Sequence, residues 1–589
     1  MTLGKSPTSE DVFRSGTGFC RDRISETSIY GLLYRESHRL FPDEAFADLF
    51  ADIGRASVPP RIVAVVMVLQ RLEGLSDREA VDRITFDLRW KYAAGGLDFD
   101  YAGFVHTVLV EMRARLRQSE RPNRIFETAL EVAREAGLIG RKRVLDSTAL
   151  YDAVATQDTV TLIRSAIRAL LQIVDAKLHA ELRACCKRDD DYLAAGKPSC
   201  DWDDVQAREA LVDALARDAY AILAALDGRT LTSEVTQAAK LVATVVGQDL
   251  EQRDDGMFRI ARRVAKDRVI STVDPEARHG HKTAARGFDG YKGHIAIDPD
   301  SEIITATTVT AGNVADGSVG GALVADVLVE PTSATEESDI GEIKMTAHAN
   351  QAPAAEVPDG GGAGTLVADV LAETPATESL DDRVAETVAA VADDRVVEAV
   401  ALVEIYGDSS YGTAQFVETI EGAGAEANVK VQPPSAPEGK FAKDAFDIDL
   451  TNNTVRCPAG MLVVIRSSTA GSDGLRLASF GVRCNNCQLR SQCTGGKEGR
   501  TIRVHPHEAT LQRSRNRQRD PEWKARYRAT RPKVERKIGH LMQRRHGGRR
   551  ARVRGCARIT HDFALLGAAH NLRRLATLGV HHDGTTWTR

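Results

Sequence analysis

The 589-residue sequence contains no run of eighteen apolar residues, and a helix needs about that length to span a lipid bilayer. We therefore expect no membrane-spanning segment. The first residues, Met1-Thr-Leu-Gly-Lys-Ser6, lack the charged and then apolar stretch of a secretory leader, so we do not expect secretion. Cysteine is scarce: there are nine, an odd number, and four of them cluster late in the chain. This favours reduced thiols or a metal site in a reducing compartment over a disulfide framework.

Aromatic side chains are nearly lacking between residues 318 and 400, which are rich in Ala, Val, Glu, Asp, Thr and Gly. Within this stretch Leu323-Val-Ala-Asp-Val-Leu328 recurs 43 residues later as Leu366-Val-Ala-Asp-Val-Leu371. Two copies are too few for a solenoid. Residues 359–364 have the composition of a flexible linker. We interpret the stretch as an acidic, partly disordered insertion produced by local duplication.

The overall composition is otherwise typical of a soluble globular protein. Hydrophobic residues make up 43% of the chain and charged residues 27%, which is enough to bury a large core. The length predicts about two to four structural units.

Positive charge is concentrated near the C-terminus. From Thr494 onward there are 24 Lys and Arg against 7 Asp and Glu, a formal charge of +17, while the chain as a whole carries −5. The rest of the chain therefore carries −22. Such asymmetry indicates a surface that binds a polyanion, although a solvated basic helix surface gives the same count.

Apolar residues recur at helical spacing between residues 28 and 140. Residues 61–71 predict an apolar helix and residues 104–116 an amphipathic one. Short helices joined by tight turns occur both in DNA-binding modules and in ordinary bundles, so the pattern leaves both roles open. Residues 1–27 are expected to form a loose tail. A second helical stretch, 159–265, is expected to be an insertion used for packing or for clamping DNA.

Two strands are predicted to end in a carboxylate. In Arg141-Lys-Arg-Val-Leu-Asp146-Ser-Thr-Ala-Leu150 a basic triplet runs into a short apolar strand that ends at Asp146. Residues 401–412 repeat this design around Asp408, where the backbone turns on glycines. A third carboxylate, Glu535, lies in the basic helical segment 531–540.

These three carboxylates suit phosphoryl transfer with two divalent ions. Such chemistry needs carboxylates on a rigid frame that hold the ions about 3.5–4 Å apart. Magnesium prefers oxygen ligands and keeps several waters, so three carboxylates and a substrate phosphate are sufficient. Taken singly, each residue is more simply explained as a turn Asp or a surface Glu. In combination, their contexts favour a functional site.

Further strands are predicted before the acidic stretch. Residues 269–273 carry a strand pattern. The β-branched runs 293–297 and 303–309, separated by the turn Asp298-Pro-Asp-Ser301, predict an antiparallel hairpin.

At this point the chain resembles bacterial insertion-sequence transposases of the DDE type, of the long kind with a cysteine cluster between the second Asp and the Glu. The resemblance covers about residues 41–575, apart from the insertion. It implies an α/β fold with an RNase H-like mixed sheet flanked by helices, a helical N-terminal domain, and helical and acidic insertions. The matching segments, in chain order, are Val144–Thr148 with Asp152–Gln157, Asp274–Lys282, Phe288–His294, Thr310–Asp316, Gly407–Gly412 and Arg531–Arg536.

The resemblance also implies a function. Asp146, Asp408 and Glu535 would be the catalytic triad and would bind two Mg²⁺ or Mn²⁺ ions. The protein would bind the ends of an insertion sequence, cleave DNA, and transfer strands to a target. Its DNA partners would be the double-stranded terminal inverted repeats and the target. The protein would act as a homodimer or a larger synaptic assembly. No membrane partner is expected. We expect a bacterial cytoplasmic protein associated with the nucleoid.

The helix of Glu535 departs from the family pattern. Arg531, four residues before Glu535, matches the basic residue found on the same helix face in many such transposases. Related families often place Tyr three residues before that Arg and Lys seven residues after the Glu. This chain has Arg528 and Met542 at those positions, with Tyr527 one residue away. The phosphate-contacting roles on this helix therefore stay open.

Arginine-rich runs at residues 513–519 and 544–554 flank Glu535. Arginine binds phosphate bidentately, and such contacts supply affinity more than sequence choice. The residues predicted to contact DNA are Arg528, Arg531, Arg544, Arg545, Lys292 and His294.

The late cysteines form a pattern that suits zinc. Cys484-Asn-Asn-Cys487 is a knuckle that supplies two thiolates at the right separation, and Cys457 and Cys493 complete a set of four. The remaining spacing is loose, so His505 and His507 are alternative ligands and free buried thiols are the competing interpretation.

Two other functions compete with a transposase. A nuclease with the same core would cut DNA without joining it. A decayed, inactive copy, suggested by the acidic repeat, would bind DNA ends only. The predicted division of the chain is 1–27 tail, 28–140 helical domain, 141–317 first part of the catalytic core with insertion 159–265, 318–400 acidic insertion, 401–456 second part of the core, 457–510 cysteine cluster, 511–578 basic helical segment, and 579–589 tail.

Overall fold

The computed structural model describes residues 1–6, 15–153, 156–194, 196–283, 286–328, 402–467 and 474–589. The second copy of the repeat and nearly all of the predicted acidic insertion lie outside these residues. No helix in the described part of the chain is both long enough and apolar enough to cross a membrane.

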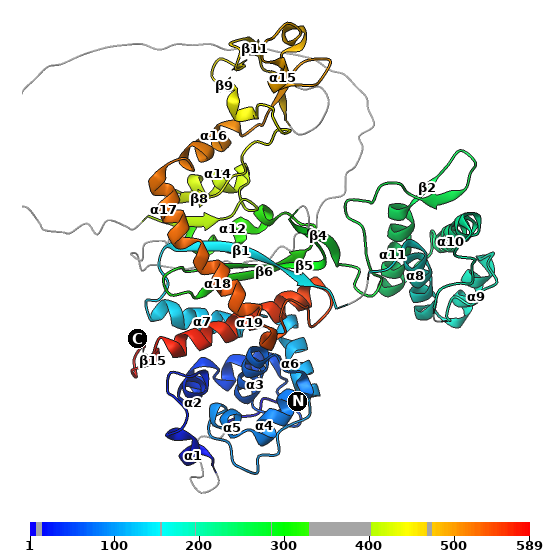
Figure 1. Ribbon diagram of the computed structural model, residues 1–589. Helices are drawn as coiled ribbons and strands as arrows, with labels where there is room; N and C mark the ends of the chain where they lie inside the picture. The colour runs from blue at the N-terminus through cyan, green and yellow to red at the C-terminus, as the bar shows by residue number, and fades with distance from the viewer. Residues whose placement is uncertain (7–14, 154–155, 195, 284–285, 329–401, 468–473) are drawn as a thin grey trace, which may run out of the picture. The chain divides into compact units, whose positions relative to one another are not determined.

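A mixed sheet organises the chain (Figure 1). Its strand order is β4-β5-β1-β7-β8, with β6 also paired to β5. The predicted hairpin is confirmed as β5–β6, and β1 pairs antiparallel to β5 but parallel to β7. This topology, with helices on both faces, is an RNase H-like fold, as predicted. The strands are β1 (Lys142–Tyr151), β4 (Arg278–Thr283), β5 (Arg286–Ile297), β6 (Ile304–Ala311), β7 (Glu404–Gly407) and β8 (Glu426–Val429).

Alternation along the central strands gives the sheet two buried faces. Val144 belongs to one apolar cluster and its neighbour Leu145 to another, because successive side chains of a strand point to opposite faces. Helices α18 (Pro532–Leu541) and α19 (Cys556–Thr577) pack on the first face. Short η2 (Asp316–Val319), α12 (Gly320–Leu323), α13 (Ala325–Leu328) and α14 (Ala414–Gly422) accompany the second.

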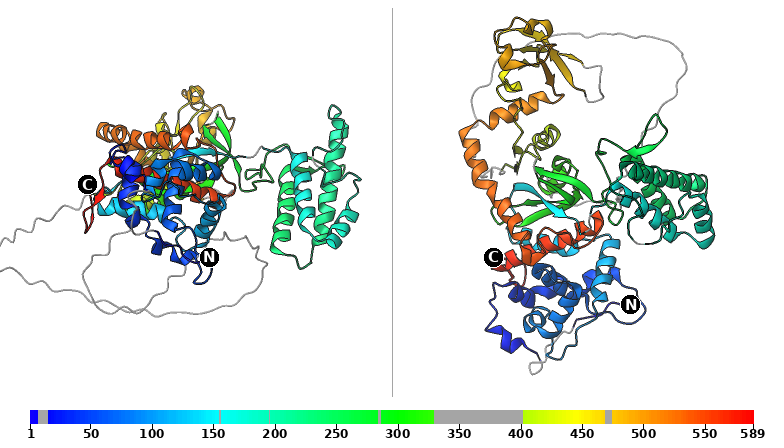
Figure 2. Two further views of the ribbon diagram at one scale, coloured as in Figure 1. Left: turned by 90° about the horizontal axis from the view of Figure 1, so that it is seen from below. Right: turned by 45° about the vertical axis from the view of Figure 1, so that its right-hand side comes forward.

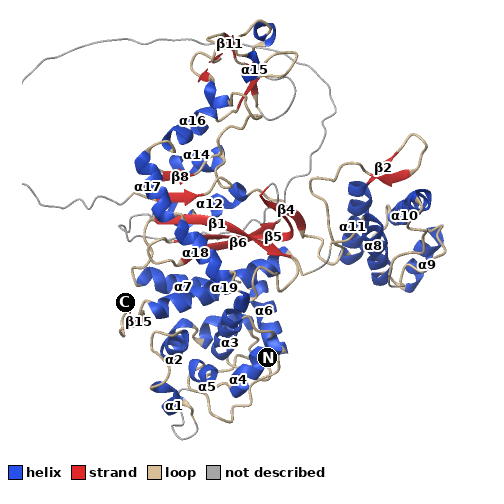
Figure 3. Ribbon diagram, in the orientation of Figure 1, coloured by secondary structure: helices blue, strands red, loops and turns tan. Residues whose placement is uncertain are grey.

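The N-terminal region is helical, as Figure 3 shows, and it shares one core with the first face of the sheet. The predicted helices at 61–71 and 104–116 are confirmed as α3 and α6. Pro60 starts α3, and Gly74 ends it in the left-handed conformation that suits glycine. The elements are α1 (Thr17–Arg21), α2 (Ile29–Leu40), η1 (Asp43–Leu49), α3 (Pro60–Glu73), α4 (Asp77–Phe86), α5 (Leu88–Ala93), α6 (Thr107–Gln118) and α7 (Arg124–Glu135).

The stretch between β1 and β4 forms helices around an apolar core of its own. They are α8 (Thr159–Ile173), α9 (Ala176–Cys185), α10 (Val205–Leu226) and α11 (Ser233–Asp249), followed by the hairpin β2 (Leu250–Gln252) and β3 (Phe258–Ile260).

The strand predicted at residues 269–273 is wrong. The segment pairs with no strand among the described residues, although Val269 and Ile270 are buried. Side chains hold its backbone instead: Gln248 accepts from Val269 N, and Gln157 accepts from Thr272 N. The buried β-branched residues therefore gave this segment the sequence pattern of a strand, although its backbone is not hydrogen-bonded to a neighbouring strand.

The cysteine region contains two small sheets, and its core runs from Phe446 to Val504, so it begins before the predicted boundary at 457. After it, α16 (Glu508–Arg517) and α17 (Pro521–Thr530) lead into α18 (Figure 2). The remaining elements are η3 (Lys443–Ala445), β9 (Asp447–Asp449), β10 (Thr454–Arg456), β11 (Leu462–Val464), β12 (Arg466–Ser467), β13 (Arg476–Ser479), η4 (Gly481–Cys484), α15 (Arg490–Cys493), β14 (Thr501–Val504), η5 (Arg544–His546), β15 (His581–His582) and β16 (Trp587–Thr588).

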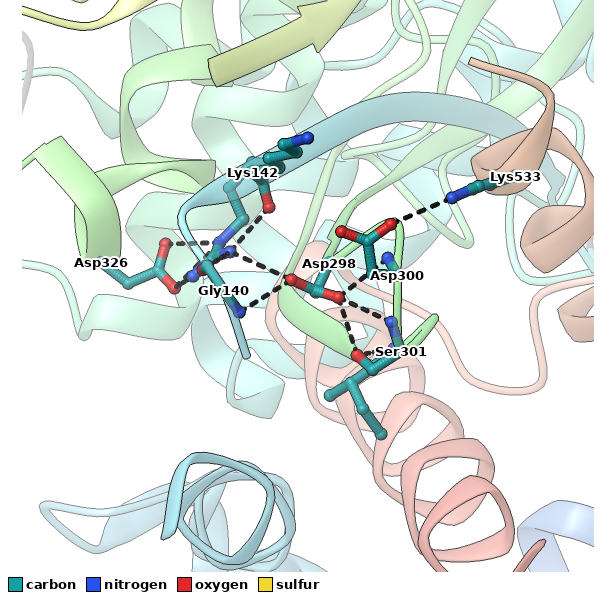
Figure 4. A network of polar contacts seen from close by, with 9 residues as sticks. Gly140, Lys142, Asp298, Asp300, Ser301, Asp326 and Lys533 are labelled. Atoms are coloured by element: carbon teal, nitrogen blue, oxygen red, sulfur yellow. Dashed lines mark hydrogen bonds and ion pairs between the residues drawn. The ribbon is translucent and has the colours of Figure 1, made fainter. Parts of the chain in front are cut away.

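A buried polar network fixes the start of β1 against the β5–β6 turn (Figure 4). Arg143, whose side chain is 2% exposed, pairs with Asp326 at 2.7 Å and lies 4.0 Å from Asp298. Asp298 also accepts hydrogen bonds from Gly140 N at 2.9 Å and Ser301 N at 2.7 Å. Because β1 carries Asp146 three residues after Arg143, this network holds the strand that positions the predicted site.

Candidate active site

The sheet register places Asp146 and Asp408 side by side. Lys142 pairs with Glu404 and Val144 with Tyr406, so continuing the register by two residues sets Asp146 opposite Asp408. Neighbouring strands lie about 4.8 Å apart. Asp408 directly follows β7, as predicted, but the strand predicted to end at Asp146 continues to Tyr151, because β5 pairs with it along that whole length. Asp146 is further fixed by Ser147 N, which donates to its Oδ1 at 2.8 Å.

The third carboxylate comes from α18, which packs across β1. Val534 and Ile538 of this helix are buried, whereas the side chain of Glu535 is 63% exposed. Arg531 caps the start of α18 and lies one helical turn before Glu535.

Arg531 is the residue that brings the three carboxylates together. Its Nη2 lies 2.9 Å from Asp146 and 3.9 Å from Asp408, and its Nη1 lies 3.6 Å from Glu535. The guanidinium is buried, so the attraction is screened by little water. Thus residues separated by hundreds of positions form one cluster.

The charges of this cluster perturb one another. Burial raises the pKa of Asp146 and the neighbouring Asp408 adds to the rise, while Arg531 opposes it. Burial works against the charged form of Arg531, but the carboxylates of Asp146 and Asp408 outweigh it and raise the pKa of the guanidinium. A carboxyl group whose pKa is perturbed by burial and by specific charged neighbours is a frequent feature of functional sites.

Two tyrosines border the cluster and were not predicted. Tyr411 is fully buried, and burial together with Asp316 and Asp146 raises its pKa. Tyr527 donates to Gly407 O at 3.2 Å, and burial raises its pKa to about 12. Tyr527 therefore faces the site although the family pattern expects Tyr one position later. The sequence signal that could have identified Tyr527 is its place, one position from the tyrosine that the family pattern expects.

A fourth carboxylate, Asp316, lies behind the site and was also not predicted as a site residue. It accepts hydrogen bonds from Ser147 Oγ at 2.6 Å and Lys292 Nζ at 2.8 Å. Since Ser147 follows Asp146 directly, this contact helps to hold the segment of β1 that carries Asp146.

Lys292 and His294 are engaged inside the protein. Lys292 donates to Asp316 and to Val314 O. His294 is fully buried, and its two ring nitrogens contact Tyr411 Oη and Thr310 Oγ1, each at 2.9 Å. Burial lowers the pKa of His294 to about 4, so the ring is neutral at physiological pH. In this arrangement both nitrogens of His294 and two of the three donors of Lys292 are used inside the protein.

The predicted arginines fall in different places. Arg531 is in the cluster, and Arg528 lies exposed on α17. Arg544 and Arg545 are exposed in η5, which packs against α3 of the N-terminal helices. The structure thus separates the two last arginines from Arg531 and places them beside the N-terminal region.

The donor set of the carboxylate cluster suits a hard divalent cation. All three groups are carboxylate oxygens, the ligand type that Mg²⁺ and Mn²⁺ prefer. They gather around Arg531 rather than around one point. In the part of the chain that the structure describes, no three His, Cys, Asp or Glu side chains converge closely enough to hold a metal ion unaided.

The four late cysteines share one small cavity of about 20 Å³, lined by Cys457, Cys484, Cys487 and Cys493. Burial raises the pKa of Cys493. Four thiols are a donor set that suits tetrahedral zinc, so the zinc site stays a prediction. His505 and His507 do not line this cavity; His507 Nδ1 pairs with Glu418 instead.

Comparisons with known protein families agree with the architecture. Residues 254–335 and residues 456–576 each match a family described as "Transposase DDE domain", and residues 21–115 match "Transposase domain (DUF772)". No curated protein and no solved structure matches the chain. The first DDE match contains β4, β5 and β6 of the RNase H-like sheet, and the second contains Arg531 and Glu535. The chain is an insertion-sequence transposase of the DDE superfamily.

Proposed function

We propose that this transposase binds the ends of an insertion sequence, cleaves them and joins them to target DNA, using Asp146, Asp408 and Glu535 to hold two Mg²⁺ or Mn²⁺ ions. DDE transposases act on DNA and generally use divalent metal ions. The observation that carries the proposal is the buried Arg531, which gathers these three carboxylates from two parallel strands and a helix.

Each residue has a task that follows from its position. Asp146 lies within β1 and Asp408 directly after β7, and the pairing of these two strands gives the rigid frame that phosphoryl transfer needs. Glu535 is exposed on α18 and is free to turn toward the two aspartates. When bound, the divalent ions would activate the attacking oxygen and stabilise the leaving oxygen.

Arg531 has donors left for the substrate. Its Nε and Nη1 have no hydrogen-bond acceptor among the described residues. A phosphate oxygen beside Asp146 and Asp408 would satisfy them, and arginine suits this role because its planar fork matches phosphate geometry. Arg531 therefore both neutralises the carboxylates and orients DNA.

DNA affinity would come from the basic C-terminal region and the N-terminal helices. The region from Thr494 carries a formal charge of +17, which attracts the phosphate backbone without choosing a sequence. The N-terminal helices are the candidate for recognising the ends. Two ends must meet during transposition, so the working form is proposed to be a dimer or larger assembly.

The test is cleavage and joining of DNA that carries the inverted repeats flanking the gene. Wild type and Asp408→Asn are compared with and without Mg²⁺. Asp300→Asn is the matched control, because Asp300 is 71% exposed and pairs with Lys533, which lies outside the cluster. We expect wild type and Asp300→Asn to cut and join, and Asp408→Asn to bind DNA while losing at least about a hundredfold in rate.

The other outcomes identify the competing functions. Cutting without joining of pre-cut ends would make the protein a nuclease. Binding without cutting, in Mg²⁺ and in Mn²⁺, would make it an inactive DNA-binding remnant. Full activity of Asp408→Asn would refute the assignment of the site.

A further inference from the structure

A second polar cavity lies away from the carboxylate cluster. It encloses about 220 Å³ between α18, η5, α19 and the β5–β6 turn. Around α18 each residue advances by about 100°, so Lys537 is about 200° from Glu535 and lies on the opposite side of the helix. The side chains that matter here are Lys537, Arg545, His570, Arg573, Arg574 and Glu302.

Most of the positively charged side chains that line this cavity have no carboxylate paired with them among the described residues. Lys537 is only 4% exposed, yet it forms no hydrogen bond or ion pair with any described residue. Arg545, Arg573 and Arg574 also pair with no carboxylate in the described part of the chain. Glu302 is the single acid of the lining, and its carboxylate is already bound by Arg536.

A buried histidine adds an unused polar group. His570 lines the cavity, is 6% exposed, and its Nε2 has no hydrogen-bond partner among the described residues. Burial of such a nitrogen without a partner is costly. Burial and the surrounding cations lower the pKa of His570 to about 2, which is the effect expected where positive charge is in excess. An anion would supply both the missing charge and the missing acceptors.

The size and the opening of the cavity restrict the anion. Pockets that enclose a whole drug-sized ligand measure about 300–1,000 Å³, so 220 Å³ suits a single small group. Arg545, Arg573 and Thr577 also line a neighbouring hollow of about 620 Å³ that reaches Ser28 and Tyr30 of the N-terminal region. A group that projects from a longer molecule therefore has a path to Lys537.

We propose that this cavity binds a phosphate group through Lys537, Arg573 and Arg574. The phosphate belongs either to the backbone of bound DNA, which rests on the proposed function, or to free inorganic phosphate. If the phosphate belongs to DNA, the cavity binds the duplex on the side of α18 that faces away from the reacting phosphodiester. It thereby sets the register of the DNA against the carboxylates without taking part in the chemistry.

The first experiment uses inorganic phosphate. The melting temperature of the full chain is measured with phosphate and with chloride at equal ionic strength, because a ligand that binds the folded state raises it. We expect phosphate to stabilise wild type but neither Lys537→Met nor Arg573→Gln. Lys533→Met is the matched control: it lies on the same helix, but its amine pairs with Asp300 at 3.2 Å and does not line the cavity.

The second experiment measures binding of a DNA duplex that carries the inverted repeat, as a function of salt. If the phosphate belongs to DNA, Lys537→Met and Arg573→Gln bind at least about tenfold more weakly, and each lowers the salt slope by about one. Arg573 is exposed, so its replacement leaves the core intact even if Lys537→Met folds poorly. Asp408→Asn keeps the phosphate effect, which separates this proposal from the catalytic one.

Each outcome of the two experiments either supports the proposed phosphate site or overturns it. Phosphate stabilisation that the two cavity variants lose, together with unchanged DNA binding, keeps the cavity as a site for free phosphate and removes DNA as the source. Phosphate stabilisation that both variants retain places the anion elsewhere and overturns the proposal. The absence of any phosphate effect in wild type, with unchanged DNA binding by the variants, also overturns it.

Discussion

Arg531 stands where three carboxylates would otherwise repel one another. Its buried guanidinium is within 4 Å of Asp146, Asp408 and Glu535. A divalent cation at the same cluster would carry out the same neutralisation with twice the charge. The residue therefore links the stability of the ion-free protein to the site that is proposed to bind the ions.

Replacing Arg531 with Met should destabilise the protein by about 3 kcal/mol, because a buried carboxylate loses its partner. Mg²⁺ should restore much of this loss, since the ion supplies the missing charge, whereas it should affect wild type less. The measurement is urea unfolding with and without Mg²⁺. Arg528→Met, on the exposed side of α17, serves as control and should change little.

An Arg531→Met variant that unfolds at the same urea concentration with and without Mg²⁺ would show that the cluster does not bind the ion.

Three of the site residues were predictable from sequence alone because each has a local signal. Asp146 and Asp408 each follow a short apolar run, and Glu535 follows Arg531 by one helical turn. Tyr411 and Asp316 were missed, because their role depends on which loops the sheet brings behind β1. His294 was predicted to contact DNA, and no local pattern around it indicated that both of its nitrogens are used inside the core.

At the scale of the elements, β1 depends on the polar network at its start. Asp298 accepts from the backbone of Gly140 and Ser301 and lies near the buried Arg143. The local pattern Asp298-Pro-Asp-Ser301 predicted the turn correctly. It did not predict that the same Asp would tie the turn to the start of β1.

Asp298→Ala should therefore cost about 3–5 kcal/mol of unfolding free energy, since it leaves buried donors and the charge of Arg143 under-satisfied. Asp300→Ala, two residues away on the surface, should cost less than about 1 kcal/mol because it breaks only an exposed ion pair. Chemical denaturation of the two variants compares them directly. Equal losses would show that the network does not anchor β1.

The cysteine region gives a separate test at this scale. If Cys457, Cys484, Cys487 and Cys493 hold zinc, purified protein should contain about one zinc per chain, and Cys487→Ser should lose it. Removal of the metal should make residues 446–504 sensitive to protease, because this region has a small core of its own. Cys185→Ser, a surface thiol elsewhere, is the control. Metal-free protein with an equally resistant cysteine region would leave these residues as free thiols.

The false strand at residues 269–273 shows what pattern cannot resolve. Val269 and Ile270 are buried, as a strand residue would be, but Gln157 and Gln248 supply the backbone partners. The spacing of apolar residues in the sequence indicates which residues are buried. Whether a buried segment forms a strand also depends on which other segment lies next to its backbone.

At the scale of the whole molecule, buried neutral histidines make stability depend on pH. The pKa values of His294 and His561 are lowered to about 4 and that of His570 to about 2, in each case chiefly by burial. In the unfolded chain each has a pKa of about 6.5. The unfolded state therefore binds more protons between these values, and the stability is fully present above about pH 6.5 and lost as the pH falls.

Between pH 6.5 and 5, each of these histidines should remove up to about 2 kcal/mol of unfolding free energy. The measurement is urea unfolding at several pH values in this window, where most carboxylates stay ionised. His561→Phe should lower the dependence on pH by about one proton, because its ring lies in the core. An unchanged dependence would show that His561 is already protonated in the folded protein.

The pairing of β1 with β7 also affects when the sheet can form during synthesis of the chain. Tyr151 ends β1, and Glu404 begins β7 253 residues later (404 − 151). A ribosome that adds about 5–20 residues per second needs roughly 13–50 s to cover that interval. During it, the β1 edge that will carry β7 has no partner, and Asp146 has neither Asp408 nor Arg531 beside it. The cluster of Asp146, Asp408, Arg531 and Glu535 is thus incomplete until the ribosome has nearly finished the chain, so any activity that depends on this cluster begins only near the end of synthesis.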